Sequence, residues 1–171
     1  MRLPLWADLR AIVTDVDGCL TDGGISYAGG EEALRTFNTH DGLGHHLLAE
    51  AGIVVGWLSA TSNGASIQRR AAQLRVPAVD IGVGPKDSRF VDLCARLGVA
   101  PRQCLYIGDD LNDFPVFPLA GASACPADAH AAVRASADLV LETAGGRGCF
   151  REAADILLAG LERPGSGLGA P

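Results

Sequence analysis

Short apolar runs rich in β-branched residues alternate along this chain with segments of helical periodicity. Such alternation predicts a parallel sheet covered by helices on both faces, and therefore an α/β fold. The expected strands are residues 11–18, 53–59, 78–82, 104–110, 121–127 and 137–142. The expected helices are residues 41–52, 64–75, 86–98 and 149–162, with an irregular helix in the proline-containing stretch after residue 110.

The length of 171 residues suits one domain, which we expect over residues 1–162, with a β-hairpin at about 24–38 and a Gly/Pro-rich tail at 163–171. A net charge of −6 without a long basic run argues against nucleic-acid binding. No apolar stretch is long enough to span a bilayer, and the amino terminus lacks a signal-peptide core. Five scattered cysteines predict free thiols and a cytoplasmic protein.

Polar residues stand where the expected strands end. In open α/β sheets, ligands bind beyond the carboxyl ends of the strands. That rule selects Asp15, Asp17, Ser59, the segment just before Lys86, and Asp109 onward. These positions are far apart in the sequence, but the fold would bring them to one edge of the sheet.

This set of residue types suits phosphate-ester hydrolysis. Asp15 and Asp17 would share one face of a strand. An ionised Asp15 carboxylate can attack phosphorus, while Asp17 exchanges protons with the leaving group and the hydrolytic water. Attack by an anion on a phosphate dianion needs charge neutralisation, which Mg²⁺ supplies. Asp109 and its acidic neighbours would complete the magnesium site, and Lys86 would add a fixed positive charge.

Each motif alone has a simpler interpretation. Asp-x-Asp-Gly also occurs in surface turns and calcium loops, and an acidic stretch such as 108–113 also begins helices. Together, with a lysine between them, the two acidic motifs favour catalysis. We expect His40, His45 and His46 to lie at a helix start and on the surface rather than to bind a metal.

The motifs then show a family resemblance. Asp15-Val16-Asp17-Gly18, Ser59, Lys86 and Gly108-Asp109-Asp110 resemble the four motifs of haloacid dehalogenase superfamily phosphatases. "LTDGGISY", "FNTHDGLG", "YIGDDLNDFPV", "ADAH" and "AGGRGCFRE" are similar to the 3-deoxy-D-manno-octulosonate 8-phosphate (KDO 8-phosphate) phosphatase family, over most of residues 11–158.

The resemblance implies a Rossmann-like fold, a hairpin in place of a cap domain, and a homotetramer whose subunits shield one another's sites. It makes Asp15 the nucleophile and a Mg²⁺ ligand, and Asp17 the general acid/base that also binds the metal through its carbonyl. Asp109 would be the third ligand, with Asp110 and Asp113 supporting it.

The resemblance also assigns the substrate side of the site. Ser59 and Lys86 would hold the phosphoryl group. The residues expected to contact substrate are Gly18, Thr21, Asn63 and Arg147. Arg147 either pairs with a substrate carboxylate, which arginine matches in shape, or belongs to a glycine turn of purely backbone importance.

The chain departs from the family at the second motif. KDO 8-phosphate phosphatases usually carry Thr-Gly-Arg there, whereas this chain reads "LSATSNGAS" (58–66). Ser59 is the expected phosphate-binding hydroxyl, with Thr61 as the alternative. Ser59 with Asn63 is similar to relatives associated with acylneuraminate cytidylyltransferases. The alternatives are therefore a nine-carbon acylneuraminate 9-phosphate phosphatase or a non-catalytic partner of a cytidylyltransferase. The pathway, whether lipopolysaccharide, capsule or sialic-type acid, stays open.

Overall fold

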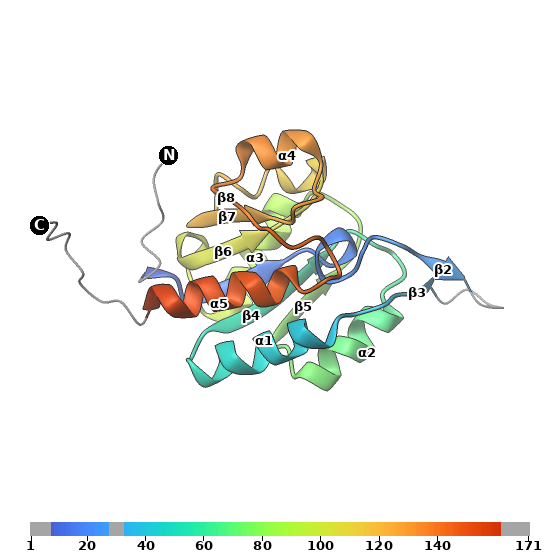
Figure 1. Ribbon diagram of the computed structural model, residues 1–171, viewed down its shortest axis with the longest axis horizontal. Coiled ribbons are helices and arrows are strands. Elements are labelled where there is room, and N and C mark those ends of the chain that lie inside the picture. Colours follow the sequence, from blue (N-terminus) through green and yellow to red (C-terminus); the bar gives the residue numbers. More distant parts are fainter. Residues whose placement is uncertain (1–7, 28–32, 162–171) are drawn as a thin grey trace, which may run out of the picture.

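The computed structural model describes residues 8–27 and 33–161, which form an α/β fold around a parallel sheet (Figure 1). The sheet strands are β1 (Ala11–Thr14), β4 (Val54–Ser59), β5 (Ala78–Ile81), β6 (Cys104–Ile107), β7 (Ala122–Cys125) and β8 (Leu139–Val140). Their order is β5-β4-β1-β6-β7-β8, and every neighbouring pair is parallel. The expected parallel α/β sheet is therefore confirmed.

Helices cover both faces of this sheet, as expected. The helices are α1 (Thr39–Glu50), α2 (Ala65–Leu74), α3 (Lys86–Leu97), α4 (Ala131–Ser136) and α5 (Cys149–Leu161). One core joins the sheet to α1, α2 and α5, through residues such as Leu48, Ile67 and Phe150. The second core, on the opposite face, joins it to α3 through Phe90 and Leu93.

The central strand shows why the sequence folds this way. All four residues of β1 are buried, and Ile12 belongs to one core while Ala11 and Val13 belong to the other. A strand covered on both faces needs a continuous apolar run, because neither face meets water.

Strands β2 (Ser26–Tyr27) and β3 (Ala33–Leu34) pair antiparallel and project from the body of the molecule (Figure 1). They lie within the hairpin expected in place of a cap. The turn between them and the expected tail at 163–171 lie outside the described residues.

All six sheet strands are shorter than expected, and two of them end three or four residues early. We expected strands through residues 18 and 110, but β1 ends at Thr14 and β6 at Ile107. Asp17 and Gly18 lie in a kinked turn, Val16–Leu20, in which Gly18 has a φ of 100°. Asp15 and Asp17 therefore do not alternate along a strand, because the chain turns sharply where the carboxylates begin.

The helix expected after residue 110 is also absent from the structure. One short turn, Leu111–Asp113, is followed by irregular turns up to β7. Pro115 and Pro118 lie in this segment, and neither has the N–H that a helical hydrogen bond requires.

The position of His45 also differs from the expectation that it lies on the surface. His40 and His46 are exposed as expected, but His45 is buried. Its Nε2 accepts a 2.9 Å hydrogen bond from the Trp57 indole, and its Nδ1 lies 2.7 Å from the Asp41 carbonyl oxygen. Because both nitrogens are engaged, the ring is a polar member of the core.

Among the described residues, no helix combines the length and the apolar character that a membrane span needs.

Candidate active site

The carboxyl ends of β1, β4 and β6 meet at one edge of the sheet. Thr14 at the end of β1 is in register with Trp57 of β4 and Ile107 of β6. A cavity of about 290 Å³ opens beyond these ends. Its lining residues are Asp15, Asp17, Ile25, Ser59, Ala60, Thr61, Asp109, Asp110 and Asn112. The structure thus gathers here four of the five expected acids and the expected hydroxyl, while Asp113 does not line the cavity.

Asp15 directly follows β1 and is nearly buried. Its backbone N–H donates to the Ile107 carbonyl over 2.8 Å, which fixes it between the strands. Its carboxylate Oδ1 lies 2.8 Å from the Lys86 ammonium. Burial raises the pKa of Asp15 well above its ordinary value; Lys86 opposes this, while Asp113 and Asp109 add to it.

Asp109 approaches the turn after β1 more closely than a side chain there would permit. A Cβ placed on Gly18 would clash with the Asp109 carboxylate. Gly18 was expected to contact substrate, but the structure shows it making room for this acid. Burial and the charge of Asp113 raise the pKa of Asp109 to about 6.

Asp113 is fully buried, and four donors surround it. Its Oδ1 accepts from the Lys86 ammonium at 2.7 Å and from the Tyr106 hydroxyl at 2.6 Å. Its Oδ2 accepts from the backbone N–H groups of Asp109 and Asp110, at 3.0 and 3.2 Å. Asp113 therefore holds the lysine and the acidic loop in place, and it does not line the cavity.

Lys86, at the start of α3, lies between Asp15 and Asp113. Burial alone would lower the pKa of Lys86, but these two carboxylates outweigh it and raise the pKa above its ordinary value. The amine is therefore a permanent cation. Asp110 is exposed, and its side chain accepts from the N–H of Leu111 over 2.7 Å.

The donor set fits a magnesium ion. Among the described residues, one ligand atom from each of Asp15, Cys19 and Asp109 lies within 4.8 Å of the others. Mg²⁺ prefers the two carboxylates to the Cys19 thiol, whose pKa is raised by burial and by neighbouring acids. Within residues 8–27 and 33–161, the ammonium beside Asp15, Asp109 and Asp113 is that of Lys86 alone. A divalent cation would offset this excess negative charge.

Asp17 is held by an arginine that the sequence analysis did not select. Arg35, just after β3, contacts both oxygens of the Asp17 carboxylate, with Nε to Oδ1 at 2.6 Å and Nη2 to Oδ2 at 3.0 Å. Arg35 has no motif around it, and no sequence signal indicated that the hairpin would bring it here.

The second motif places both candidate hydroxyls at the cavity. Ser59 and Thr61 each line it, so the structure does not separate the expected residue from its alternative. Asn63 does not line the cavity; its carbonyl accepts from Arg35 over 3.0 Å. The Ser59 carbonyl accepts from Arg89 of α3 over 2.8 Å, which ties this loop to the helix that carries Lys86.

The remaining predicted residues lie behind the cavity or outside it. Thr21 is fully buried, and its hydroxyl is 3.4 Å from the Val16 carbonyl. A Cβ on Gly145 would clash with the backbone of Gly18, so the glycine turn at 145–146 packs directly on the kinked turn Val16–Leu20. Arg147 is exposed and does not line the cavity.

Three further residues line the cavity without having been predicted, namely Ile25, Ala60 and Asn112. Ile25, which precedes β2, forms an apolar part of the wall, and Asn112 contributes an amide beside Asp110. All three lie inside quoted motifs ("LTDGGISY", "LSATSNGAS" and "YIGDDLNDFPV"), but the sequence analysis assigned them no role.

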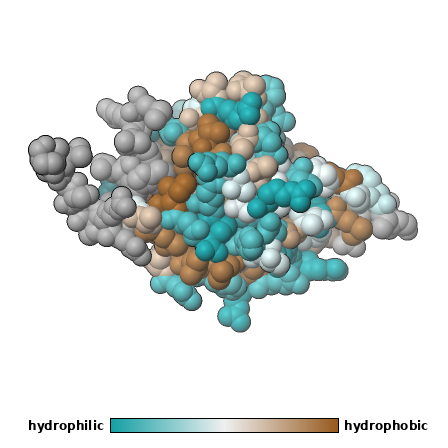
Figure 2. Space-filling view, in the orientation of Figure 1, coloured by the Kyte–Doolittle hydropathy of each residue, from teal (hydrophilic) through white to brown (hydrophobic). Residues whose placement is uncertain are grey.

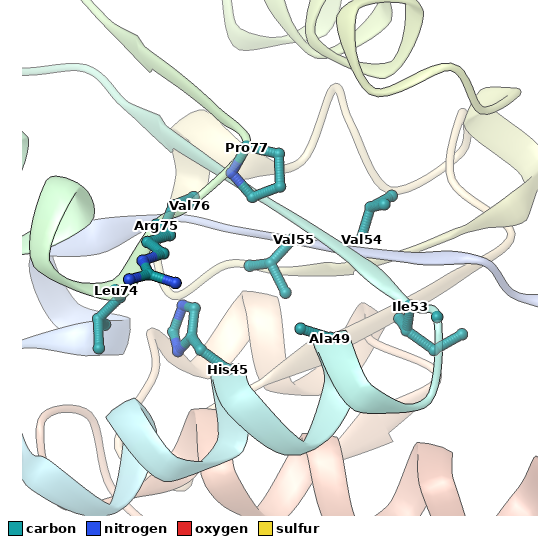
Figure 3. A pocket seen from close by; sticks show the side chains of 10 residues that line it. His45, Ala49, Ile53, Val54, Val55, Leu74, Arg75, Val76 and Pro77 are labelled. Carbon is teal, nitrogen blue, oxygen red and sulfur yellow. The ribbon is translucent and has the colours of Figure 1, made fainter.

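A second cavity, of about 190 Å³, lies between α1, the start of β4 and the end of α2 (Figure 3). It is lined mainly by aliphatic residues such as Ala49, Val55 and Leu74, and the His45 ring faces it. Because the His45 nitrogens are already engaged in the core, this cavity offers no catalytic constellation comparable with the first.

Comparison with known proteins supports this geometry. A family model described as haloacid dehalogenase-like hydrolase matches residues 85–150. The 3-deoxy-D-manno-octulosonate 8-phosphate phosphatase KdsC of Haemophilus influenzae is 40% identical over 151 residues, covering 88% of this chain and 83% of that protein. KdsC of Escherichia coli K12 is 37% identical, with coverage of 88% and 80%.

The similar solved structures include phosphatases of the same kind. The cobalt-bound form of the H. influenzae phosphatase superimposes with a TM-score of 0.88 and 38% identity, covering 92% of each chain. The Moraxella catarrhalis 3-deoxy-D-manno-octulosonate 8-phosphate phosphatase, in complex with a magnesium ion, a phosphate ion and KDO, gives 0.86 and 30%, covering 92% of this chain and 90% of that one.

Proposed function

This chain belongs to the 3-deoxy-D-manno-octulosonate 8-phosphate phosphatase family of haloacid dehalogenase-like hydrolases, and on that basis we propose how it acts. It is a Mg²⁺-dependent phosphatase, and its substrate is a 2-keto-3-deoxy sugar acid phosphate of the KDO 8-phosphate type. The observation that supports its mechanism is the meeting of the Asp15 and Asp109 carboxylates beside the Lys86 ammonium, at the open edge of the sheet.

In the proposed mechanism, Asp15 forms a bond to phosphorus as the bond to the sugar oxygen breaks. Asp17 gives its proton to that leaving oxygen. A water molecule then attacks the phosphorus of the aspartyl-phosphate and returns a proton to Asp17. Inorganic phosphate leaves, and Asp15 is again a carboxylate.

The surrounding residues orient these two acids. Lys86 fixes the Asp15 carboxylate, and we assign Lys86 and the Ser59 hydroxyl to the phosphoryl oxygens. Asp15, Asp109 and the Asp17 backbone carbonyl would hold Mg²⁺, which would supply the charge neutralisation that an anionic nucleophile needs beside a phosphate dianion. The four bonds to Asp113 favour a supporting role over a place among the metal ligands.

Phosphate release from KDO 8-phosphate and from N-acylneuraminate 9-phosphate, with and without Mg²⁺, tests the function. We expect turnover of the eight-carbon substrate to exceed that of the nine-carbon one, and to require the metal. Asp15→Asn should abolish release, because an amide is not a nucleophile toward phosphorus. Activity retained in that variant would contradict the mechanism. No turnover of either substrate would instead support a non-catalytic partner of a cytidylyltransferase.

We also infer a homotetramer in which the hairpin meets another subunit. Ile25, Tyr27 and Leu34 on or beside the hairpin are 45%, 72% and 46% exposed. Figure 2 shows brown, apolar surface at the hairpin end of the molecule. Exposed apolar patches commonly mark interaction sites. Light scattering after gel filtration should give four times the chain mass for the wild type and a smaller mass for Tyr27→Ser.

We place the protein in the cytoplasm. All five cysteines are buried and none forms a disulfide, although Cys94 and Cys104 have their sulfur atoms 3.5 Å apart. Reduced neighbouring thiols are typical of a reducing compartment. Cell fractionation with an antibody to the chain would test this location.

A further inference from the structure

Arg35 is the residue that carries a further inference. Its side chain is fully shielded from solvent, although the residue belongs to a projecting hairpin. Besides its two bonds to Asp17, it donates from Nη1 to the Asn63 carbonyl at 3.0 Å and to the Ser66 hydroxyl at 3.2 Å. Nη2 also lies 3.3 Å from the Thr61 hydroxyl. One guanidinium therefore connects the hairpin to the turn Val16–Leu20 and to the second-motif loop at residues 58–66.

The contact between Arg35 and Asp17 involves the proposed general acid. Proton transfer requires a carboxyl oxygen of Asp17 to reach the leaving oxygen of the substrate. Both oxygens are instead held by the planar fork of Arg35, at 2.6 and 3.0 Å. Asp17 must loosen at least one of these bonds before it can act. A second carboxylate has the same shape and charge, so it can take the place of Asp17 on the fork.

The proposed substrate brings such a carboxylate. The described residues that line the active-site cavity include four aspartates, namely Asp15, Asp17, Asp109 and Asp110, and neither Lys nor Arg. Lys86 is already paired with Asp15 and Asp113. Among the described residues, the guanidinium bound directly to a cavity-lining carboxylate is that of Arg35. It is therefore the natural partner for the acid group of a sugar acid.

We propose that Arg35 binds the carboxylate of the substrate and, in doing so, releases Asp17 for proton transfer. The exchange makes and breaks ion pairs: Asp17 leaves Arg35 as the substrate carboxylate arrives, and the freed Asp17 carboxylate takes up a proton from solvent, which it then gives to the leaving sugar oxygen. This inference rests on the proposed sugar acid substrate. The exchange at Arg35 gives this site, whose second motif lacks an arginine, a way to distinguish sugar acid phosphates from sugar phosphates without a carboxylate.

Two substrates separate this role from a merely structural one. KDO 8-phosphate has a carboxylate, and arabinose 5-phosphate is a sugar phosphate without one. Arg35→Gln should lower kcat/KM for KDO 8-phosphate by about 10- to 100-fold, the loss expected for a charge-assisted contact. The same variant should raise kcat/KM for arabinose 5-phosphate, because Asp17 is no longer held. Arg35→Lys keeps the charge without the fork and should fall between Arg35→Gln and the wild type on KDO 8-phosphate.

Controls make the outcome decisive. Arg69→Gln, on the exposed side of α2, should match the wild type on both substrates. The gain of Arg35→Gln on arabinose 5-phosphate should vanish when Asp17→Asn is added. Equal losses of Arg35→Gln on both substrates would overturn the proposal, as would full activity on KDO 8-phosphate.

A binding measurement distinguishes failure of this inference from failure of the proposed function. Calorimetric titration with KDO, the phosphate-free acid, should show affinity about 10- to 100-fold weaker in Arg35→Gln than in Arg69→Gln. Equal affinities would overturn the role of Arg35 whatever the turnover. Wild-type protein that binds KDO through Arg35 but does not hydrolyse its 8-phosphate would contradict the proposed function alone.

Discussion

The ammonium of Lys86 and the carboxylate of Asp113 form an ion pair 2.7 Å apart, and both side chains are shielded from solvent. The pair connects the start of α3 to the loop that follows β6. Because Asp113 also accepts from the Tyr106 hydroxyl and two backbone N–H groups, it organises the site without lining it.

Asp113→Asn should therefore be strongly destabilising. It leaves Lys86 buried with one carboxylate fewer, and breaking a buried pair typically costs about 3–5 kcal/mol. Urea unfolding would measure the change. Asp110→Ala is the control, because it removes only an exposed cap on Leu111 and should cost about 1 kcal/mol. Similar losses in the two variants would show that Asp113 is no more than another loop carboxylate.

Gly18→Ala and Gly52→Ala test the close approach of Asp109. Both glycines have positive φ, at 100° and 76°, so each alanine should cost about 1–2 kcal/mol of stability. A Cβ on Gly52 meets nothing within 4 Å, whereas one on Gly18 meets the Asp109 carboxylate. Calorimetric titration with Mg²⁺ should show weakened binding in Gly18→Ala only. Unchanged Mg²⁺ affinity in Gly18→Ala would remove Asp109 from the proposed ligands.

Arg89 should position the phosphate-binding loop. It donates to the carbonyls of Ser59 and Gly82, at 2.8 and 2.6 Å, and pairs with Asp80. Arg89→Gln frees the Ser59 backbone, and we expect inhibition by inorganic phosphate to weaken about 10-fold, the value of one charge-assisted hydrogen bond.

Arg96→Gln is the matched control for Arg89→Gln. Arg96 also pairs with Asp80, over 3.1 Å, but is half-exposed and donates to the Val79 carbonyl instead of the Ser59 carbonyl. Its phosphate inhibition constant should equal that of the wild type. A 10-fold shift of the phosphate inhibition constant in both variants would show that the loss of the ion pair with Asp80, and not the loss of the hydrogen bond to the Ser59 carbonyl, weakens phosphate binding.

His45 should make the fold sensitive to acid. Burial lowers its pKa from 6.5 to about 4, with Arg70 and His46 adding to the shift and the Asp41 carbonyl opposing it. Below pH 6.5 the unfolded chain binds a proton that the folded chain refuses, so stability falls as the pH drops toward 4. The full loss is about 3 kcal/mol, at 1.36 kcal/mol per pKa unit.

The neighbouring Asp41 works in the opposite direction. Burial raises its pKa to about 6, so the folded chain gains stability as the pH falls from 6 toward 3.8. The contribution of His45 must therefore be read as a difference between variants. Urea unfolding from pH 7.5 to 4.5 should show a shallower acid loss in His45→Gln than in the wild type. The exposed His46→Gln removes only the smallest contribution to the His45 shift and should stay close to the wild-type profile. Identical profiles in all three proteins would contradict the assignment.

The sequence predicted the architecture well where one physical rule acts alone. Continuous apolar runs placed β1, β4 and β6 in a buried parallel sheet, and the strand-end rule then brought Asp15, Ser59 and Asp109 together. These inferences require only that parallel strands share an edge.

Other features depended on contacts between distant segments. Arg35, just after β3, reaches Asp17 where the chain returns from the projecting hairpin, and no local sequence pattern predicts that contact. Asp113 could be a ligand or a support until the positions of Tyr106 and Lys86 were known. His45 sits in a sequence that reads as a helix surface, yet the Trp57 indole and a 4.1 Å stack on Phe150 draw it inside.

The position of β1 also determines how late in synthesis the central sheet can be completed. β1 is made first but lies between β4 and β6, so both of its edges are paired only after residue 107 has been added. A growing chain that stops earlier leaves one edge of β1 open to other strands. Asp15, the proposed nucleophile, therefore leaves the ribosome well before β6, and its surroundings are complete only when β6 has paired with β1.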